Sequence, residues 1–374
     1  MSINMLGRII WFILIVAALT LLFRSALVPL FFTEAKESAV PRLVEARGNL
    51  AEDEESTIEL FENSRDSVVF ITTRQRVMDV WTRNTFSVPR GTGSGFIWDD
   101  DGHIVTNFHV IKGASEATVR LADGRDYKAV LVGASPAHDI AVLKVGIGLQ
   151  RPRPVPLGTS HDLKVGQKVF AIGNPFGLDW TLTTGIVSAL DRSLPGDDGR
   201  NIENLIQTDA AINPGSSGGP LLDSAGRLIG INTMIYSPTG ASAGVSFSVP
   251  VDTVNRVVPQ LISRGKYIRP GLGITVDSKL NERLIGMLNI TGVVILGINP
   301  GSAAAAAGLK GATITPDGKV KPGDVIVALD NRPIITVDEL LARLDKYKVG
   351  DVVQVTILRE EKEITLPITL QPGV

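Results

Sequence analysis

The chain has 374 residues, which is longer than one ordinary hydrophobic core and predicts two domains with additional segments. Its 37 basic and 39 acidic residues leave a net charge of −2, so no basic excess is available to contact a nucleic acid. The absence of cysteine excludes thiol catalysis, disulfides and thiolate metal sites. Only four histidines are present, which argues against a histidine-rich metal site. We therefore expect no metal and no cofactor.

The N-terminal part of the sequence contains a long apolar run. It extends from Ile9 to Phe23 with one threonine inside it, and it is flanked by Arg8 and Arg24. Because about 20 apolar residues are needed to cross a bilayer, either Arg24 snorkels or the span extends to about Phe32. A buried globular helix would not be apolar on every face, and a cleaved signal peptide would need a small-x-small site that does not follow the run. We expect residues 1–33 to form a cytoplasmic tip and an uncleaved transmembrane anchor.

The charges on the two sides of this run predict its orientation. Residues 34–62 carry nine acidic and three basic residues, whereas Arg8 precedes the run. Since basic residues favour the cytoplasmic side, we expect the N-terminus in the cytoplasm and the bulk of the chain outside it. Residues 34–57 lack a sustained apolar periodicity and are predicted to be an acidic tether, with a helix beginning at Ser56 or Thr57.

Short runs rich in valine and isoleucine follow at close spacing, separated by turn signals. They predict a mainly β domain, either a sandwich or a barrel. The runs lie at residues 68–72, 94–98, 104–106, 117–121, 129–132, 140–145, 168–172, 185–188, 228–232 and 245–249. Residues 253–264 have the apolar spacing of a helix, although Pro259 counts against it. We place one domain at residues 58–264 and a second at residues 265–374.

Small residues surround Ser217 in the segment Asn213 to Pro220, which reads Asn-Pro-Gly-Ser-Ser-Gly-Gly-Pro. A serine hydroxyl becomes a nucleophile only with a base in hydrogen-bond reach, a group that orients this base, and N–H donors for the developing oxyanion. Small residues let the chain turn sharply and bring its amides close to a substrate carbonyl. A pair of ordinary turns is the alternative interpretation of this segment alone. We predict that the backbone of Gly215, Ser216 and Ser217 forms an oxyanion hole, with the Gly215 and Ser217 amides as donors.

Two further residues would complete a catalytic triad. His109 lies near the end of an apolar extended run, and Asp139 immediately precedes the run 140–145. Taken singly, they could be a core histidine and a carboxylate that caps a strand. The chain order histidine, aspartate, serine is the order found in chymotrypsin. The coincidence of all three signals predicts that His109 is the general base for Ser217 and that Asp139 orients it.

These segments resemble the signatures of the HtrA/Deg family of trypsin-like serine proteases. The matching segments are Thr106-Asn-Phe-His109-Val, His138-Asp139-Ile-Ala-Val and the segment around Ser217. The resemblance extends from about Ile58 to the C-terminus and implies two packed six-stranded β-barrels, the first carrying His109 and Asp139 and the second carrying Ser217.

Position 216 departs from the pattern of this family. It is serine, where the family commonly has asparagine and digestive enzymes of the wider class have an aspartate that pairs with a newly cut N-terminus. The main-chain donors do not depend on this side chain. Ser216 cannot form that ion pair, so the sequence argues against activation by zymogen cleavage.

The sequence also limits which substrate side chains the S1 pocket can prefer. None of the seven residues before Ser217 is acidic, which argues against a pocket that selects Lys or Arg by charge. We expect Ile212 and the segment Ile231 to Tyr236, with Asn232 and Thr233, to line a small or medium apolar S1 pocket.

The C-terminal part resembles a single PDZ domain. The resemblance rests on residues 267–274, 292–296, 300–304 and 321–329 and on an expected helix at 336–346. Such a domain adds a peptide strand to its sheet edge and captures the peptide carboxylate with backbone amides. Gly271, Leu272, Gly273 and Ile274 are the expected carboxylate loop, with Leu272 and Ile274 in the wall of an apolar pocket. The alternative is a small β domain that only packs on the protease.

One anchor, one protease and one PDZ domain resemble the membrane-anchored, envelope-stress branch of the family. This resemblance implies a bacterial homotrimer in the inner membrane, with its catalytic and PDZ domains in the periplasm. Its PDZ domain would bind exposed C-termini of misfolded proteins, and its protease would cut a regulatory membrane protein. The alternatives are a general periplasmic quality-control protease or chaperone, and a PDZ scaffold without proteolytic activity.

Overall fold

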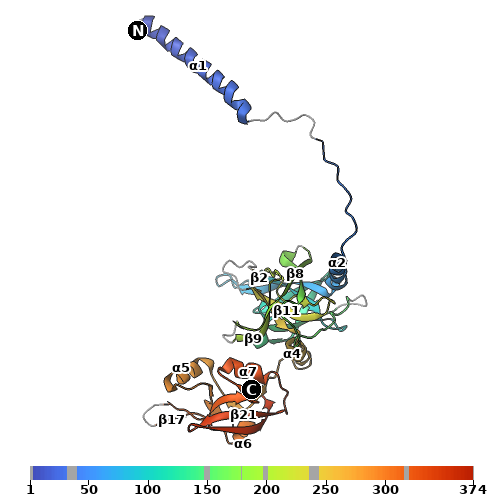
Figure 1. The fold of residues 1–374 in the computed structure, drawn as a ribbon, viewed down its shortest axis with the longest axis vertical. Coiled ribbons are helices and arrows are strands. Elements are labelled where there is room, and N and C mark those ends of the chain that lie inside the picture. The colour runs from blue at the N-terminus through green and yellow to red at the C-terminus, as the bar shows by residue number, and fades with distance from the viewer. Residues whose placement is uncertain are drawn as a thin grey trace. The chain divides into compact units, whose positions relative to one another are not determined.

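The computed structural model describes residues 3–31, 40–146, 152–177, 179–196, 201–235, 244–315 and 320–373. The chain divides into two units, Met1–Ala51 and Glu52–Val374 (Figure 1). The first unit contains the helix expected at the N-terminus, and the second contains the β-rich part and the C-terminal domain.

Helix α1 (Ile3–Phe31) contains a stretch, Leu6–Ser25, that is long and apolar enough to cross a membrane, with a mean hydropathy of 2.4. None of this stretch is buried against other described residues, so the alternative of a buried globular helix is wrong. Its two hydroxyls are bonded inside the helix: Thr20 donates to the Val16 carbonyl at 2.9 Å and Ser25 to the Leu22 carbonyl at 3.1 Å. Internal hydrogen bonding of this kind suits a helix surrounded by lipid, but a signal sequence would pass the same test.

Helix α2 (Glu52–Ser64) begins earlier than the sequence predicted. Ser56 and Thr57 do not cap it; their hydroxyls donate to the carbonyls of Glu52 and Asp53 one turn earlier, at 2.8 and 2.7 Å. The first turn consists of four acidic residues, whose charges are favourable at the positive end of the helix dipole. The predicted start at Ser56 or Thr57 was therefore too late. Residues 52–57 belong to a helix that buries Leu60 in the main apolar cluster of the β-rich part.

The first six strands close into a barrel in the order β1-β2-β3-β6-β5-β4. Closure leaves no strand edge free to pair with another chain. Apolar side chains such as Ile71, Ile97 and Ile104 fill the interior. The elements are β1 Val68–Met78, β2 Thr85–Ile97, β3 His103–Thr106, α3 Phe108–Ile111, β4 Glu116–Arg120, β5 Asp126–Ser135, η2 Pro136–His138 and β6 Ile140–Val145, preceded by the 3₁₀ turn η1 Arg65–Ser67.

A second closed barrel has the order β10-β11-β12-β9-β8-β7. Together the two barrels confirm the predicted trypsin-like double barrel, and every predicted strand run overlaps an observed strand. Two strands, β9 and β10, were not predicted. The elements are β7 Lys168–Gly173, η3 Pro175–Gly177, β8 Thr181–Pro195, β9 Asn201–Thr208, β10 Pro220–Leu222, β11 Leu228–Ile235 and β12 Ser246–Pro250.

Helix α4 (Val251–Arg264) confirms the predicted helix, with Pro259 inside it. Its apolar face, including Val254, Val258 and Leu261, is fully buried against β5, β6 and β11, strands of both barrels. This burial outweighs the hydrogen bond that Pro259 removes. Gly265 ends the helix in the left-handed conformation at φ 72° and donates its amide hydrogen to the Leu261 carbonyl.

The C-terminal domain is built on a sheet with the order β15-β19-β21-β22, and β20 pairs with β19. Helix α7 (Val337–Leu344) confirms the predicted helix; Thr336 caps it by accepting the Glu339 amide hydrogen. The other elements are β13 Pro270–Gly271, β14 Ile274–Thr275, α5 Ser278–Leu288, β15 Val293–Val294, β16 Gly297–Ile298, α6 Ala303–Ala306, β17 Thr313–Ile314, β18 Val320–Lys321, β19 Val325–Leu329, β20 Arg332–Pro333, β21 Val352–Arg359, β22 Lys362–Thr369 and β23 Gln371–Pro372.

Candidate active site

Ser217 lies in the loop between β9 and β10, at a point where the backbone needs glycine. Gly215 and Gly218 have φ values of 98° and 88°, which are strained for residues with a side chain. A Cβ on Gly218 would also lie 2.1 Å from the Ser94 carbonyl oxygen. The loop is fixed to the first barrel by a 2.8 Å hydrogen bond from the Ser94 amide to the Ser217 carbonyl. This explains the small residues that drew attention to the segment in the sequence.

His109 and Asp139 come from the first barrel and are joined by two hydrogen bonds. Nδ1 of His109 lies 2.8 Å from Oδ2 of Asp139, and the His109 amide donates to Oδ1 at 2.9 Å. Asp139 is buried and has a left-handed backbone with φ 52°. The side-chain amide of Asn107 donates to its carbonyl at 2.9 Å, which holds this unusual conformation. A hydrogen bond at Nδ1 leaves Nε2 as the basic nitrogen of the neutral imidazole.

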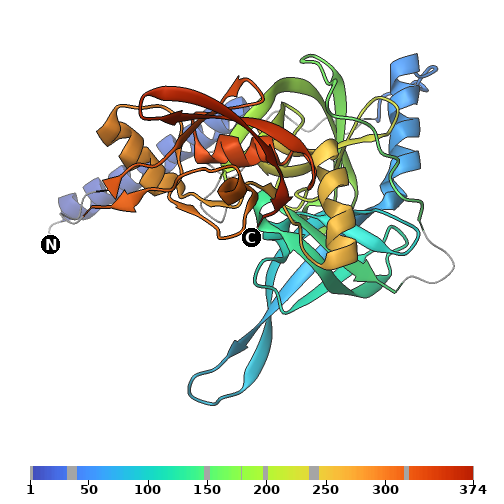
Figure 2. The same ribbon diagram turned by 90° about the horizontal axis from the view of Figure 1, so that it is seen from below.

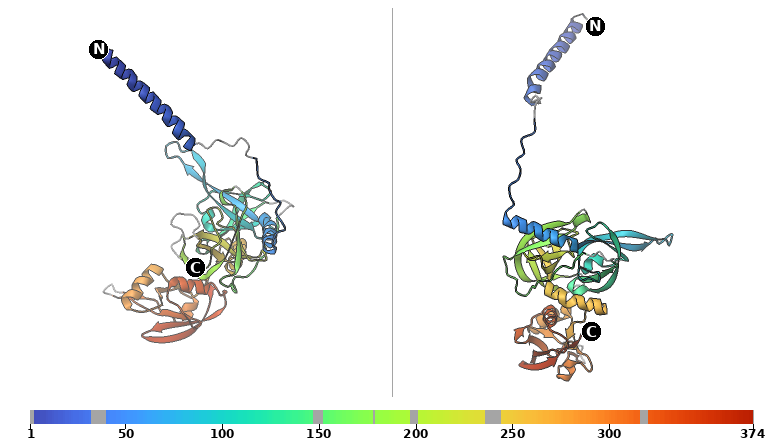
Figure 3. Two further views of the ribbon diagram at one scale, coloured as in Figure 1. Left: turned by 45° about the horizontal axis from the view of Figure 1, so that its top comes forward. Right: turned by 90° about the vertical axis from the view of Figure 1, so that its right-hand side faces the viewer.

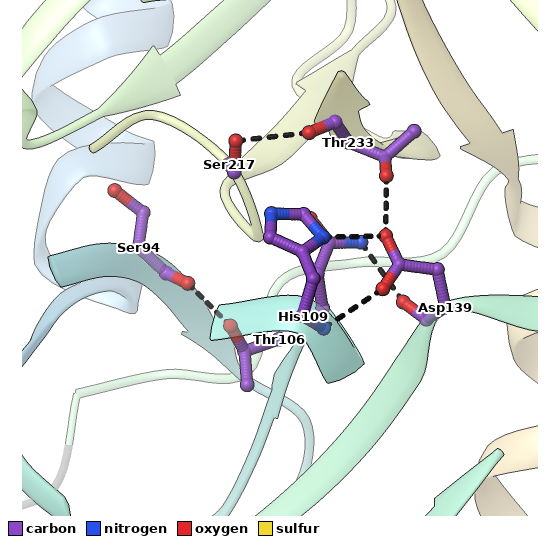
Figure 4. Close-up of polar contacts among 7 residues, drawn as sticks. Ser94, Thr106, His109, Asp139, Ser217 and Thr233 are labelled. Carbon is purple, nitrogen blue, oxygen red and sulfur yellow. Dashed lines mark hydrogen bonds and ion pairs between the residues drawn. The ribbon is translucent and has the colours of Figure 1, made fainter. Parts of the chain in front are cut away.

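Thr233, on β11, connects the serine with the aspartate. Its hydroxyl donates to Oδ2 of Asp139 at 2.5 Å, and its carbonyl accepts a 2.9 Å hydrogen bond from Oγ of Ser217. Figure 4 shows the imidazole of His109 between Ser217 and Asp139. The structure thus brings together all three residues of the predicted triad and adds a fourth that links them.

The predicted oxyanion-hole backbone lies next to this group. Among the described residues, no carbonyl accepts a hydrogen bond from the amides of Gly215 and Ser217, whereas the Ser216 amide donates to the Asn213 carbonyl. The hydroxyl of Ser94 donates to the Gly215 carbonyl at 2.7 Å and so turns this carbonyl into the protein interior. The two amides predicted to be oxyanion donors therefore make no backbone hydrogen bond in the described part of the chain.

The predicted S1 residues lie in the second barrel. Ile212 and Ile231 are fully buried in apolar clusters, and Asn232 is buried with its side-chain amide bonded to the Pro220 carbonyl at 3.0 Å. Thr233 makes the contacts given above, and Tyr236 lies outside the described residues. The role of these residues in a substrate pocket stays a prediction.

The predicted carboxylate loop of the C-terminal domain lines a cleft of about 910 Å³. Leu272 is buried in the domain core, and Ile274 is half-buried against the same cluster. Gly273 has φ 81°, and a Cβ there would lie 2.3 Å from Cβ of Ser302. The cleft is also lined by protease residues, among them Ser135 and His138.

A buried polar cluster joins the protease to the C-terminal domain. The Nε2 of His138 lies 3.1 Å from Oδ2 of Asp345, and Nδ1 of His138 lies 2.7 Å from the Ser135 hydroxyl. Asp345 also accepts hydrogen bonds from Arg269 and from the Tyr267 hydroxyl, each at 2.9 Å. This cluster was not predicted from the sequence, because its members belong to separate segments of the chain and no spacing relates His138 to Tyr267, Arg269 and Asp345.

The pKa values of His138, Tyr267 and Asp345 are shifted in this cluster. Burial lowers the pKa of His138, because removal from water disfavours the imidazolium more than Asp345 favours it. Burial likewise raises the pKa of Tyr267 to about 12, with Asp345 adding to the effect. At Asp345 burial acts to raise the pKa, but the hydrogen bonds from His138 and Arg269 outweigh it and hold this pKa well below its usual range. These directions favour the neutral form of His138 and the carboxylate form of Asp345, which is paired with Arg269 at 2.8 Å.

In the described part of the chain, one group of side chains has the composition of a metal site. Asp99 and Asp101 lie in the turn between β2 and β3, and His103 is the first residue of β3. Oδ2 of Asp99 is 2.7 Å from Nδ1 of His103, and Oδ1 accepts the amides of both other residues. These hydrogen bonds give the group a role in holding the turn.

Comparisons with known proteins agree with this arrangement. Residues 93–231 match the trypsin-like peptidase domain, and residues 270–370 match the PDZ domain. The chain is 48% identical to Protease Do-like 1, chloroplastic, of Arabidopsis thaliana over 339 residues, which cover 90% of this chain and 76% of that protein. It is 40% identical over 286 residues to the periplasmic serine endoprotease DegP of Escherichia coli, covering 75% of this chain and 56% of DegP. The structure of the HtrA-type protease AlgW with a decapeptide is similar, with a TM-score of 0.66, 32% identity, and coverage of 85% of this chain and 98% of AlgW.

The chain belongs to the HtrA/Deg family of trypsin-like serine proteases. This confirms the resemblance in the sequence, the double barrel and the single PDZ domain. Like its HtrA/Deg relatives, the protein is a serine endopeptidase. Its N-terminal apolar helix fits a signal anchor or a transmembrane span.

Proposed function

We propose that this HtrA/Deg protein is a membrane-anchored endopeptidase of envelope quality control or stress signalling, and that Ser217, His109 and Asp139 perform its chemistry. The observation that carries the catalytic part is the chain of hydrogen bonds from Asp139 to His109 and from Asp139 through Thr233 to Ser217. Rotation about the Ser217 Cα–Cβ bond releases its hydroxyl from the Thr233 carbonyl and turns it toward Nε2 of His109. Asp139 then stabilises the imidazolium that forms.

The reaction proceeds in two halves. Oγ of Ser217 attacks the peptide carbonyl while its proton passes to His109, and the carbonyl oxygen becomes an oxyanion held by the Gly215 and Ser217 amides. His109 then protonates the leaving amine as the C–N bond breaks, which leaves an acyl-enzyme. Water, deprotonated by His109, then attacks the ester carbonyl. The bond between the carbonyl carbon and Oγ of Ser217 breaks, His109 returns the proton to Oγ, and the new carboxyl end leaves.

The preference of the S1 pocket is part of the same proposal. The buried Ile212 and the lack of an acidic residue before Ser217 support cleavage after small or medium apolar residues. A peptide library cut by the full chain should show such residues at P1. Dominant cleavage after Lys or Arg would contradict this proposal.

The location is proposed from the N-terminal helix and from the relatives. The apolar stretch Leu6–Ser25 supports an inner-membrane anchor with its N-terminus in the cytoplasm, and periplasmic relatives support a periplasmic protease and PDZ domain. The homotrimer implied by the resemblance stays a prediction, which light scattering of the detergent-solubilised chain would test. Added protease should degrade the catalytic domain in spheroplasts but not in intact cells.

The PDZ domain is proposed to bind C-terminal peptides and to control the active site. The supporting observation is that His138, whose Nε2 contacts Asp345 of the PDZ domain, is the residue directly before Asp139. A peptide in the cleft beside this cluster would favour one arrangement of it over another, and the two sites would then be coupled. Unfolded or regulatory proteins with exposed C-termini are the expected substrates and partners.

This coupling predicts that a hydrophobic C-terminal peptide raises the rate of reporter cleavage, by about 5- to 150-fold for a typical coupling free energy. The substitution Asp345→Asn should bring the ratio of rates with and without peptide toward one, because it replaces one of the two carboxylate oxygens that serve His138, Arg269 and Tyr267 with an NH₂ donor and removes the negative charge. The matched control is Asp330→Asn, since Asp330 accepts a tyrosine hydroxyl inside the PDZ domain, from Tyr347. Equal peptide activation in wild type and both variants would contradict the proposal.

The buried histidine also predicts a dependence of stability on pH. The pKa of His138 is lowered in the folded protein, so below about pH 6.5 the unfolded chain takes up a proton that the folded chain does not. Stability is therefore lost as the pH falls below about 6.5, with a slope of at most ~1.4 kcal/mol per pH unit from this group. Urea unfolding of the full chain at pH 8 and pH 5.5 measures the difference in the free energy of unfolding between the two pH values. His138→Gln should reduce this difference, while His161→Gln, at an exposed histidine, should leave it unchanged.

Two other functions compete with this proposal. A PDZ scaffold without proteolysis is opposed by the family and by the intact arrangement of Ser217, His109 and Asp139. A general quality-control protease would cut unfolded casein without needing a peptide activator. Casein cleavage that is equally fast with and without C-terminal peptides would favour that second function over signalling.

A further inference from the structure

No segment in the described part of the chain packs on the outer half of the β1–β2 hairpin. Figures 2 and 3 show this hairpin extending away from its barrel. At its tip, Trp81 is 94% exposed and Val80 is 84% exposed, and the side chains of Met78 and Phe86 are more than half exposed. Fully exposed tryptophan among other large apolar residues is rare on a soluble surface and marks a site of interaction.

Charge around this apolar tip has one dominant sign. Between residues 74 and 90 the hairpin carries four arginines and a single acidic residue, Asp79. The arginines are Arg74, Arg76, Arg83 and Arg90. They lie on both strands and at the turn. Arg76 is paired with Glu116 at 3.1 Å, so Arg74, Arg83 and Arg90 supply the positive charge beside the apolar residues. The hairpin tip is therefore complementary to a partner that offers an apolar interior beneath a negatively charged surface.

The turn itself is ordered by the one acidic residue. Oδ1 of Asp79 accepts the amides of Trp81 and Thr82 at 2.8 and 3.0 Å, and the Asp79 amide donates to the Asn84 carbonyl at 2.9 Å. These bonds lower the pKa of Asp79, so its charge is held against the turn amides. The turn keeps Val80 and Trp81 projecting outward, and binding would cost little further ordering.

We propose that this hairpin tip docks into the headgroup region of a bilayer that contains anionic lipids. Tryptophan and phenylalanine prefer the interface between hydrocarbon and water, and arginines near it attract anionic headgroups. A narrow convex tip suits a deformable lipid surface and offers no flat area for a stable protein contact. The same chain carries the apolar helix α1, which supports the presence of a bilayer nearby. This inference goes beyond the proposed function and does not require α1 to remain uncleaved.

The absence of cysteine makes a direct test possible. The variant Thr82→Cys of the full chain, labelled with a polarity-sensitive fluorophore, is reconstituted in vesicles of phosphatidylcholine with or without phosphatidylglycerol. We expect a blue shift and at least two-fold quenching by spin-labelled lipid in the anionic vesicles, and clearly less in neutral ones. Labelled Ser263→Cys, at an exposed serine on α4, is the matched control and should show no difference between the lipids.

Two further measurements keep the test decisive. Adding Val80→Ser and Trp81→Ser to the labelled chain should abolish the shift and leave cleavage of a soluble reporter unchanged. If the reconstituted chain separates from the vesicles in gel filtration, the proposal of a membrane anchor fails. The inference about the hairpin tip still predicts the blue shift when anionic vesicles are added to this free protein. A label at residue 82 that is equally unquenched in both lipids would overturn the inference. A shift that depends on protein concentration and not on lipid charge would overturn it in favour of a contact between copies of the chain.

Discussion

The substitution Ser217→Ala is expected to lower kcat by about 10⁶-fold while the protein stays folded. It removes the only oxygen that can form the acyl-enzyme in the proposed mechanism. It also removes the hydrogen bond to the Thr233 carbonyl, which is worth only about 1 kcal/mol of stability. The loop itself depends on its glycines and on the bond from the Ser94 amide, and these do not change. Cleavage of a fluorogenic reporter measures the loss, and circular dichroism measures the fold.

The control for this variant is Ser224→Ala, at an exposed serine in the turn that follows β10. It removes a hydroxyl from the same barrel without touching the active-site loop. Activity of Ser217→Ala within tenfold of the wild-type value would refute the assignment of the nucleophile. A covalent phosphonyl adduct formed by a serine-reactive phosphonate on the wild type, and absent from Ser217→Ala, would support the assignment independently of rates.

The sequence predicted the parts of the fold that rest on local patterns. Alternating Val and Ile runs predicted the barrel strands, because one face of each strand is buried whatever its partner is. Strand β10 was missed since it is only Pro220–Leu222, too short for a periodic signal, and it follows directly on the glycine-rich loop. Helix α4 was predicted with reservation because propensity counts Pro259 heavily, whereas burial between the barrels decides the structure.

In the candidate site, the residues with distinctive local chemistry were found and their supports were not. His109, Asp139 and Ser217 stand out because histidine, a strand-edge acid and a glycine-flanked serine are unusual together. Thr233 was expected only as a pocket residue, but the structure shows its hydroxyl bonded to Asp139. A threonine in a strand is too common to indicate a partner from another barrel.

The interdomain cluster was missed for the same reason. His138 drew attention only as the neighbour of Asp139, and Asp345 follows a helix more than two hundred residues later. No spacing rule relates them, because the contact is created by the packing of one domain on another. Its discovery required the structure, and it is what gives the proposed coupling specific residues to test.

The substitution Asp139→Asn is expected to lower kcat by about 10⁴-fold at neutral pH. An asparagine can place its NH₂ group toward Nδ1 of His109, which forces the imidazole to carry its proton on Nε2, where the base is needed. It also removes the negative charge that stabilises the imidazolium, and the Thr233 hydroxyl loses a charged acceptor. Folding should be less affected, because the Asn107 bond is made to the backbone carbonyl of residue 139. The measurement is the rate of reporter cleavage between pH 6 and pH 9.

The first barrel supplies an unusually close control for this variant. Asp99 and His103 repeat the same contacts: Oδ2 of Asp99 is 2.7 Å from Nδ1 of His103, and Oδ1 accepts the His103 amide at 3.1 Å. Asp99→Asn therefore changes an aspartate–histidine pair of matching geometry that lies outside the active-site loop. Its stability should fall somewhat, while its kcat should stay near the wild-type value. If both variants lose activity in proportion to their loss of stability, Asp139 has only a structural role; a loss confined to Asp139→Asn assigns it to the orientation of His109.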